Sequence, residues 1–373
     1  MSADWFAIGN ESEVPSPALL IYLNRVESNI DLMLKMAGGP ARIRPHVKTH
    51  KLGELVRIQC ARGINQFKCA TLAEMEMTAA AGGADVLLAY QPTGPNPSRI
   101  LALAHAYPAT RFSVVVDDAS VLVSISKVFA NDPKPLGVFL DLDCGMHRTG
   151  IAPGDAAFEL YKQVCRMPGI EPRGLHCYDG HNNSTNLQER ERMVDSDFAP
   201  IIALRERLKN AGFPVPTLIA SGTPTFPIHA RYEDRECSPG TTILWDFGYG
   251  DRYADLPFQH AALLLTRVIS KPGTDRICVD LGHKAVAAEN PHPRVCFLNL
   301  NSCEAVMHSE EHLVLVTPDA PQIRVGDILF GVPRHICPTV ALHDEAFVVK
   351  DGFVCGRWPI TARRRKLSFE SAT

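Results

Sequence analysis

The stretch "LGVFLDLD", Leu136–Asp143, is an almost continuous apolar run that ends on an acidic residue. A similar run, "DVLLAY", covers residues 85–90. Strands that are buried on both faces have this composition, because helices cover both sides of a parallel sheet. These two runs therefore predict a parallel sheet with helices packed against it.

Further apolar runs lie on either side at regular intervals. Eight candidate strands follow one another: Arg42–Val47, Gln66–Thr71, Val86–Tyr90, Phe112–Asp117, Leu136–Asp143, Pro172–Tyr178, Thr217–Ser221 and Thr241–Asp246. Helical patterns separate them, among them Leu72–Ala81, Ser120–Phe129, Asp155–Arg166 and Leu187–Ala211. Strict alternation of this kind favours an α/β fold with a (β/α)₈ barrel. A doubly wound open sheet is the alternative, although no GxGxxG follows the first strand.

The pattern changes after Phe247, where short strands separated by turn residues replace the helices. These strands are predicted over Ala262–Ile269, Ile277–Asp280, Arg294–Leu298, Leu313–Thr317, Ile328–Phe330 and Ala346–Lys350. We therefore expect a barrel over residues 17–246 and a β-rich domain over 247–373. An N-terminal strand, Ala18–Leu23, could pair with either domain.

Composition excludes several classes of protein. The 373 residues are 46% hydrophobic and 21% charged with a net charge of −3, which argues against disorder and against nucleic-acid binding. No run approaches the roughly 18 apolar residues of a membrane span, and no signal peptide is evident. The 11 cysteines are scattered without a CxxC motif. We therefore expect a cytoplasmic protein with reduced, mostly buried thiols.

Polar clusters follow three of the predicted strands, where parallel barrels place their chemistry. "RPHVKTHK" carries Lys48, and a lysine held at a strand end suits Schiff-base chemistry. "DCGMHRTG" carries Arg148, which can donate to an anion. "HCYDGHNN" carries Tyr178 and His181, and histidine is the usual acid–base residue near neutral pH. Taken singly, each cluster could be an ordinary polar turn.

Two glycine- and hydroxyl-rich loops lie near the last two strands, "SGTPT" at Ser221–Thr225 and "ECSPGTT" at Glu236–Thr242. Loops at these places form the usual phosphate site of a barrel. A phosphate site together with Lys48 predicts one ligand with an aldehyde and a phosphate, which is pyridoxal 5′-phosphate (PLP). In the β domain, "RHICPT" places His335 and Cys337 two residues apart, a spacing that could hold Zn²⁺ or belong to two ordinary buried residues.

In this order, "RPHVKTHK", "GMHRTG", the Tyr and His of "HCYDGHN", "SGTPT", "SPGT" and "HIC" resemble the D-threonine aldolase and D-serine dehydratase-like family. These are PLP enzymes of fold type III, with an alanine racemase-like barrel, a C-terminal β domain and usually a homodimer. The resemblance implies that Lys48 carries the cofactor, that Arg148 binds its phenolic oxygen and that Tyr178 lines the ring site. It assigns the phosphate to Ser221, Gly222, Thr223, Gly240 and Thr241.

The resemblance further implies that His335 and Cys337 hold a divalent metal and that His181 is the base at the substrate's β-hydroxyl. Relatives carry His-x-Asp or His-x-Cys at this place; the thiolate favours Zn²⁺ and the carboxylate Mn²⁺ or Mg²⁺. The implied activity is cleavage of β-hydroxy-D-amino acids to glycine and an aldehyde, as in a D-threonine aldolase. Dehydration of D-serine or 3-hydroxyaspartate is the main alternative. Amino-acid racemisation and non-catalytic PLP carriage are the others.

Overall fold

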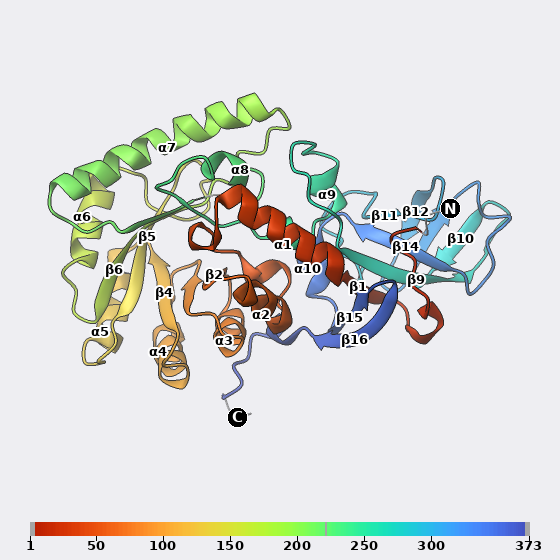
Figure 1. Ribbon diagram of the computed structural model, residues 1–373, viewed down its shortest axis with the longest axis horizontal. Coiled ribbons are helices and arrows are strands. Elements are labelled where there is room, and N and C mark those ends of the chain that lie inside the picture. Colours follow the sequence, from red (N-terminus) through yellow and green to blue (C-terminus); the bar gives the residue numbers. More distant parts are fainter. Residues whose placement is uncertain (1–3, 221, 370–373) are drawn as a thin grey trace. The chain divides into compact units, whose positions relative to one another are not determined.

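The computed structural model describes residues 4–220 and 222–369 (Figure 1). These residues form two compact units that are interleaved in the sequence. The unit called here the β unit holds the N-terminal residues up to Leu32, Thr49–Leu52 and Thr241–Arg363. The barrel unit holds Met33–Lys48, Gly53–Gly240 and the residues from Arg364 on.

Seven strands of the described barrel unit form one parallel sheet in which each strand pairs with the next along the chain. They are β2 (Gln66–Cys69), β3 (Asp85–Leu88), β4 (Arg111–Val116), β5 (Leu136–Leu142), β6 (Ile170–Cys177), β7 (Thr217–Ala220) and β8 (Glu236–Cys237). The predicted α/β class is therefore confirmed.

A short segment connects the two edges of this sheet. Ile43 bridges to β8 and His46 bridges to β2, both in parallel. The Arg44 N–H donates to the Cys237 carbonyl over 2.8 Å, and the Pro45 carbonyl accepts from Lys68 N–H over 2.9 Å. Pro45 has no N–H to donate, so the segment forms isolated bridges where a regular strand was predicted. It nevertheless takes the place of the first barrel strand.

The strand predicted over Thr241–Asp246 is wrong. The last barrel strand is β8, and Thr241–Ile243 form a short 3₁₀ helix, η4. Pro239 and Gly240 lie just beyond β8, after Ser238, and these turn residues end the strand. The loop "SPGTT" consequently follows the eighth strand, whereas it was predicted to precede that strand.

In the part of the chain that the structure describes, four helices pack against the barrel strands (Figure 1): α3 (Leu72–Ala80), α4 (Asn96–Ala106), α5 (Ala119–Phe129) and α6 (Asp155–Val164). The barrel unit also contains α2 (Gly53–Ala61), α7 (Leu187–Asn210) and α8 (Phe226–His229). Helix α1 (Leu23–Ala37) has residues in both units. Side-chain caps fix several helix starts; Oδ1 of Asn186, for example, accepts from Glu189 N–H over 3.0 Å at α7.

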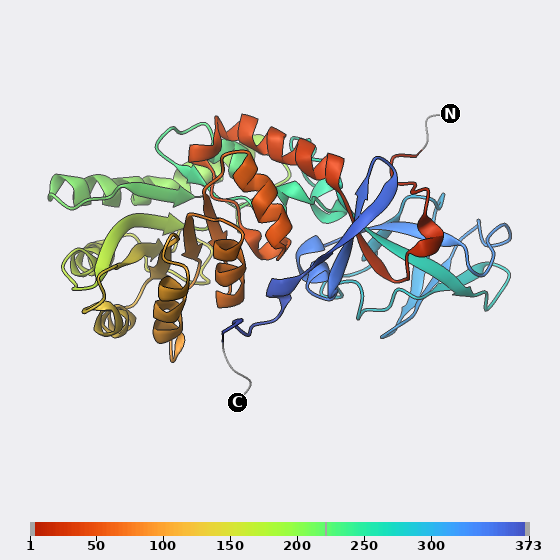
Figure 2. The ribbon, with the colours of Figure 1, turned by 60° about the horizontal axis from the view of Figure 1, so that its bottom comes forward.

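The β unit is a sheet with strand order β12-β13-β10-β9-β1-β15-β16, and β14 and β11 continue from β9. Its strands are β1 (Ala18–Tyr22), β9 (Ala262–Ser270), β10 (Arg276–Val279), β11 (Val295–Phe297), β12 (Glu304–His308), β13 (Leu313–Val316), β14 (Ile328–Pro333), β15 (Glu345–Lys350) and β16 (Phe353–Pro359). Figure 2 shows the dark blue β15–β16 hairpin beside the red β1. Strands β12 and β16 were not predicted, because their side chains are mostly exposed.

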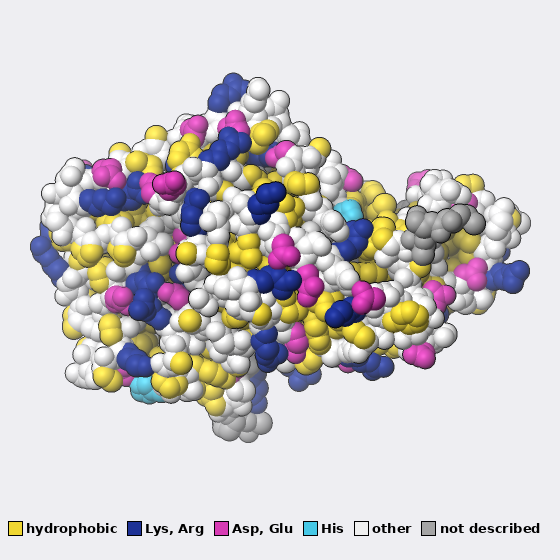
Figure 3. Space-filling model, viewed as in Figure 1, with side chains coloured by type: hydrophobic (Ala, Val, Ile, Leu, Met, Phe, Trp, Pro, Cys, Tyr) yellow, Lys and Arg dark blue, Asp and Glu magenta, His cyan; other side chains and the backbone are white. Residues whose placement is uncertain are grey.

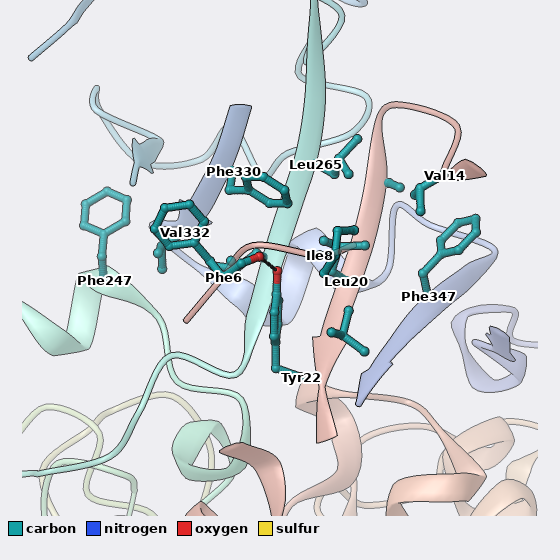
Figure 4. Packing of buried hydrophobic residues seen from close by; sticks show 13 residues of the cluster. Phe6, Ile8, Val14, Leu20, Tyr22, Phe247, Leu265, Phe330, Val332 and Phe347 are labelled. Atoms are coloured by element: carbon teal, nitrogen blue, oxygen red, sulfur yellow. Dashed lines mark hydrogen bonds between the residues drawn. The ribbon is translucent and has the colours of Figure 1, made fainter. Parts of the chain in front are cut away.

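Residues from both ends of the chain build the core of the β unit (Figure 4). Phe6 packs at 5.4 Å, centroid to centroid, from Phe330 of β14. The Tyr22 hydroxyl donates to the Phe6 carbonyl over 2.6 Å, which satisfies a buried polar group inside this apolar cluster. The N-terminal strand is therefore an integral part of the C-terminal sheet.

The surface shows no accumulation of one charge sign on the face in Figure 3, where acidic and basic side chains are interspersed. In the described residues no helix combines the length and apolar character needed to cross a membrane. All eleven cysteines lie within the described residues, and each is a free thiol.

Candidate active site

A cavity of about 230 Å³ lies in the barrel unit at the carboxyl ends of its strands. This is the end at which barrels carry their chemistry. Its wall is formed by His46, Lys48, Lys68, Ala70, Ala89, Tyr90, Arg148, Thr149, His176 and Tyr178. The structure thus brings together Lys48, Arg148 and Tyr178, which come from three distant parts of the sequence.

Lys48 lies in the 3₁₀ turn η3 (Val47–Thr49), directly after the segment that bridges β8 and β2. Its side chain is half-buried. Its backbone N–H donates to Nδ1 of His46 over 3.3 Å. This turn ends the bridging segment and holds the Lys48 amine at the cavity.

Hydrogen bonds within the loop after β5 position Arg148. The Asp143 carboxylate accepts from the N–H groups of Gly145 and His147 over 3.0 and 2.9 Å. Gly150 has a φ of +100°, and a Cβ there would lie 2.5 Å from the Asp143 nitrogen, so only glycine fits. The Arg148 guanidinium carbon lies 4.5 Å from the centroid of the Tyr178 ring. The cation is therefore oriented by this loop and by an aromatic face.

His176 lies on β6 at the cavity wall and pairs with Asp141 of β5. Its Nδ1 lies 2.7 Å from Asp141 Oδ1, and both side chains are buried. Burial lowers the pKa of His176, although Asp141 acts in the opposite direction. The neutral imidazole then donates from Nδ1 to the carboxylate. Its Nε2 is buried and has no partner among the described residues, so it can accept from a bound group.

The loop after β7, which includes Gly222 and Thr223, is held by Asp179. Asp179 follows Tyr178 and is completely buried. One carboxylate oxygen accepts from Gly222 N–H and from the Thr225 hydroxyl, each over 2.8 Å. Although burial acts against it, the neighbouring His229 and these hydrogen bonds lower the pKa of Asp179. An ionised carboxylate therefore fixes the backbone of this glycine loop.

A second layer of contacts supports Asp179. Its other carboxylate oxygen accepts from Nε2 of His229, at the end of α8, over 2.7 Å. Arg235 donates to Nδ1 of the same ring over 2.9 Å, which requires that the ring proton lie on Nε2. The loops after β7 and β8 are also joined directly, because Gly240 N–H donates to the Thr223 hydroxyl over 3.2 Å. Ser221 lies outside the described residues.

His181 is not among the cavity-wall residues described above. Its Nε2 lies 2.8 Å from Asp197 of α7, and Asn182 donates to the same carboxylate oxygen over 2.9 Å. Its Nδ1 is buried without a partner among the described residues. A Cβ on Gly145 would lie 2.7 Å from His181 Nε2, which explains the glycine at that position. The geometry is that of a histidine oriented by a carboxylate.

The β unit holds His335, Cys337, Thr241 and Thr49. Cys337 Sγ lies 3.2 Å from the Thr49 hydroxyl and 3.7 Å from the Thr241 hydroxyl. His335 is hydrogen-bonded to Cys337 and lies 2.6 Å from Glu289. Against the effect of burial, Cys337 and then Glu289 raise the pKa of His335 to about 9. The imidazole and the thiol thus lie together, with an acidic partner behind the imidazole.

The described residues contain no group of three or more His, Cys, Asp or Glu side chains arranged to hold a metal. An ion bound by His335 and Cys337 would take its remaining ligands from water or substrate. An imidazole and a thiolate are a ligand set that suits Zn²⁺. The donor chemistry of the pair therefore fits a zinc ion with open coordination positions.

Comparison with known proteins identifies the class that this barrel and cavity define. The chain belongs to the family described as alanine racemase, N-terminal domain, whose model matches residues 21–246. A D-serine dehydratase-like domain matches residues 261–349. The predicted family and the alanine racemase-like fold are thus confirmed, and membership of this family supports PLP as the cofactor.

Individual relatives extend this similarity over nearly the whole chain. D-threonine aldolase from Arthrobacter sp. is 28% identical over 357 residues, which cover 94% of this chain and 93% of the relative. 3-Hydroxy-D-aspartate aldolase from Paracoccus denitrificans is 27% identical, with coverage of 95% and 93%. The crystal structure of D-threonine aldolase from Filomicrobium marinum matches with a TM-score of 0.87 at 27% identity, covering 94% of this chain and 96% of that one.

The cavity fits PLP on observations of this chain alone. Lys48 offers an amine, and Arg148 offers a cation that lies over the Tyr178 ring. His176 Nε2 lacks a partner within the described part of the barrel. A Cβ on Gly222 would lie 3.3 Å from the Tyr178 ring, so the glycine keeps the loop close to that ring. An amine, cations and a glycine-lined loop are the groups that an aldehyde with a phosphate requires.

Three buried residues of this region were not predicted as site residues: Lys68, His176 and Asp179. Lys68 lies inside an apolar strand, and Asp179 and His176 lie beside the more conspicuous Tyr178. A charged residue inside a strand otherwise buried on both faces is itself a signal, because such residues are rarely buried without a function or a partner. That signal could have identified Lys68 from the sequence.

Proposed function

We propose that this protein is a PLP- and metal-dependent lyase that cleaves β-hydroxy-D-amino acids to glycine and an aldehyde. The observation that carries the proposal is the cavity in which Lys48, Arg148 and Tyr178 meet at the carboxyl ends of the barrel strands. The aldolase names of relatives that match over nearly the whole chain support the choice of reaction.

In this proposal Lys48 holds the cofactor and moves a proton at the substrate Cα. Bound PLP supplies an electron sink for the carbanion left when the bond to Cα breaks. Arg148 is oriented for the phenolic oxygen by the Asp143 loop and by Tyr178. Gly222, Thr223, Gly240 and Thr241, with Ser221, would bind the phosphate.

His181 is proposed as the base that takes the β-hydroxyl proton, directly or through water. Its Nε2 can donate to Asp197, which leaves Nδ1 as the acceptor. This carboxylate partner stabilises the imidazolium that forms when the hydroxyl proton arrives. The same hydrogen bond from His181 Nε2 to Asp197 orients the imidazole ring.

His335 and Cys337 are proposed to hold a divalent metal, with Zn²⁺ favoured over Mn²⁺ or Mg²⁺ by the thiolate. A metal there would lower the pKa of a hydroxyl group that it binds. We further propose that the functional barrel domain is residues 17–246 and that the β domain is residues 247–373, joined by the N-terminal strand β1, which pairs with β9 and β15. We also propose that the protein is a cytoplasmic homodimer.

The Cys337→Ala variant is expected to lose bound zinc and metal-dependent activity while it retains PLP. The reason is that the imidazole of His335 alone cannot replace a two-ligand site. Metal content by mass spectrometry and cofactor absorbance measure the two effects separately. Cys355→Ala, on the exposed strand β16, is the matched control and should change neither. Full zinc retention in Cys337→Ala would remove Cys337 from the ligand set.

Incubation of the holoenzyme with D-threonine, with and without chelator, tests the reaction. Acetaldehyde and glycine are expected in equal amounts, and the chelator should stop their formation. If 2-oxobutyrate and ammonia form and no acetaldehyde appears, the aldolase assignment is wrong.

Dehydration of D-serine or 3-hydroxyaspartate is the second candidate. The match of residues 261–349 to a D-serine dehydratase-like domain and the dehydratase names of further relatives support it. The same groups serve both reactions. The two reactions differ in the fate of the β-hydroxyl group, which loses its proton in aldol cleavage and leaves from Cβ in dehydration. The products of the assay therefore decide between the two reactions.

A further inference from the structure

The barrel cavity contains a second lysine that the proposed reaction leaves without a role. Lys68 lies on β2, only 2% exposed, and its side chain forms part of the same wall as Lys48. Lys68 is bridged to His46, so the two side chains share one face of the sheet, and both line the cavity. Within the described residues, its amine has no hydrogen bond or ion pair to another side chain.

Charged groups surround this amine without pairing with it. The ones that act on it are Lys48, Asp141, Asp179 and Arg44. Both carboxylates are already bonded: Asp141 to His176 and Asp179 to His229, each over 2.7 Å. An ammonium at Lys68 is consequently buried without a direct counter-ion, which is costly unless a further anion enters.

The charge of Lys68 therefore responds to what occupies the cavity. Burial, followed by the charge of Lys48, lowers the pKa of Lys68 to about 7, although Asp141 and Asp179 act in the opposite direction. The other titratable or charged groups of the cavity wall are His46, Tyr90, Arg148, His176 and Tyr178. Near neutral pH, a negative charge brought close to the amine would hold it protonated.

We propose that Lys68 is a binding residue of this cavity: it takes up a proton from solvent when the anionic cofactor enters, and its ammonium then neutralises negative charge on that cofactor. This inference rests on the proposed binding of PLP. It would add to the cavity wall a second cation, which forms no bond with the aldehyde. This charge would favour a phosphorylated, negatively charged ring compound. It also predicts how affinity depends on pH.

The test uses the full chain freed of cofactor and titrated calorimetrically with pyridoxine 5′-phosphate, which lacks the aldehyde and cannot bond to Lys48. Its phosphate is already doubly charged above about pH 7. Affinity should fall at least about tenfold between pH 7 and pH 9, because binding then requires uptake of a proton that is increasingly scarce. Titration in two buffers of different ionisation enthalpy should show this proton uptake directly.

Lys68→Met removes only the charge, and is expected to bind more weakly at pH 7 and to lose most of the pH dependence. Lys209→Met on α7, whose surface amine pairs with Glu206, is the matched control and should behave as the unaltered protein. Binding to the unaltered protein without proton uptake overturns the inference but leaves the proposed function intact. Absence of binding at any pH overturns both.

Discussion

Replacing Lys48 by alanine should abolish the visible absorbance of the bound cofactor and lower the rate of substrate cleavage on the order of 10³-fold or more. The amine of Lys48 is the group proposed both to hold the aldehyde and to move the proton at Cα. Its removal eliminates both roles while the Arg148 loop and the Asp179 network stay in place. Absorbance spectra of the purified variant, followed by turnover with D-threonine, measure the two effects.

The second cavity lysine makes this experiment sharper. If Lys48→Ala retains the absorbance band, borohydride reduction and peptide mass mapping will show whether Lys68 has bonded to the aldehyde. A band that persists in the double variant Lys48→Ala, Lys68→Met would exclude both lysines. Lys162→Ala, on the outer helix α6, is the control and should keep full absorbance.

Asp179→Asn is expected to destabilise the protein by about 3 kcal/mol and to weaken binding of phosphorylated ligands. One carboxylate oxygen of Asp179 faces Nε2 of His229, and the other faces the Thr225 hydroxyl and Gly222 N–H; all three partners donate. In asparagine, an NH₂ group must replace one of these two acceptor oxygens. Placing the NH₂ against a donor leaves a buried hydrogen bond unmade. Denaturation in urea gives the change in the free energy of unfolding.

Acid titration gives an independent signature of the same carboxylate. Because the folded-state pKa of Asp179 lies below the ordinary 3.8, its contribution to stability is present above that pH and is lost as the pH falls further. The variant should lack this part of the acid dependence. Asp195→Asn, at the exposed end of the Tyr232 hydrogen bond, should cost no more than about 0.5 kcal/mol. An equally small cost for Asp179→Asn would show that the network is not needed to hold the loop.

Sequence patterns predicted the fold well where burial on both faces leaves a strong signal. Strand β5 was expected over Leu136–Asp143 and is found over Leu136–Leu142. Helix α7 was expected over Leu187–Ala211 and ends one residue earlier, at Asn210. The failures have local causes. Pro45 reduces the first barrel strand to bridges, and Pro239 and Gly240 end the last strand earlier than its apolar continuation suggested.

The site was predictable in part for a related reason. Lys48, Arg148 and Tyr178 lie in segments that follow barrel strands, so the barrel rule predicts that they meet, and all three line the cavity. The groups that hold them were not predictable, because they act across long separations. Asp179 reaches His229 fifty residues away, and no pattern within either segment indicates that pairing.

The pairing of β1 with β15 and β9 has a consequence for biosynthesis. Strands β2 to β8 follow one another along the chain, so the ribosome delivers the barrel sheet in the order in which it pairs. The partners of β1, by contrast, emerge only after the whole barrel sheet has been made. Until β9 has been synthesised, the apolar residues of "ALLIY" have no strand to pair with in this sheet. Exposed strand edges of this kind favour aggregation. Residues 17–246 produced alone would retain this unpaired strand permanently.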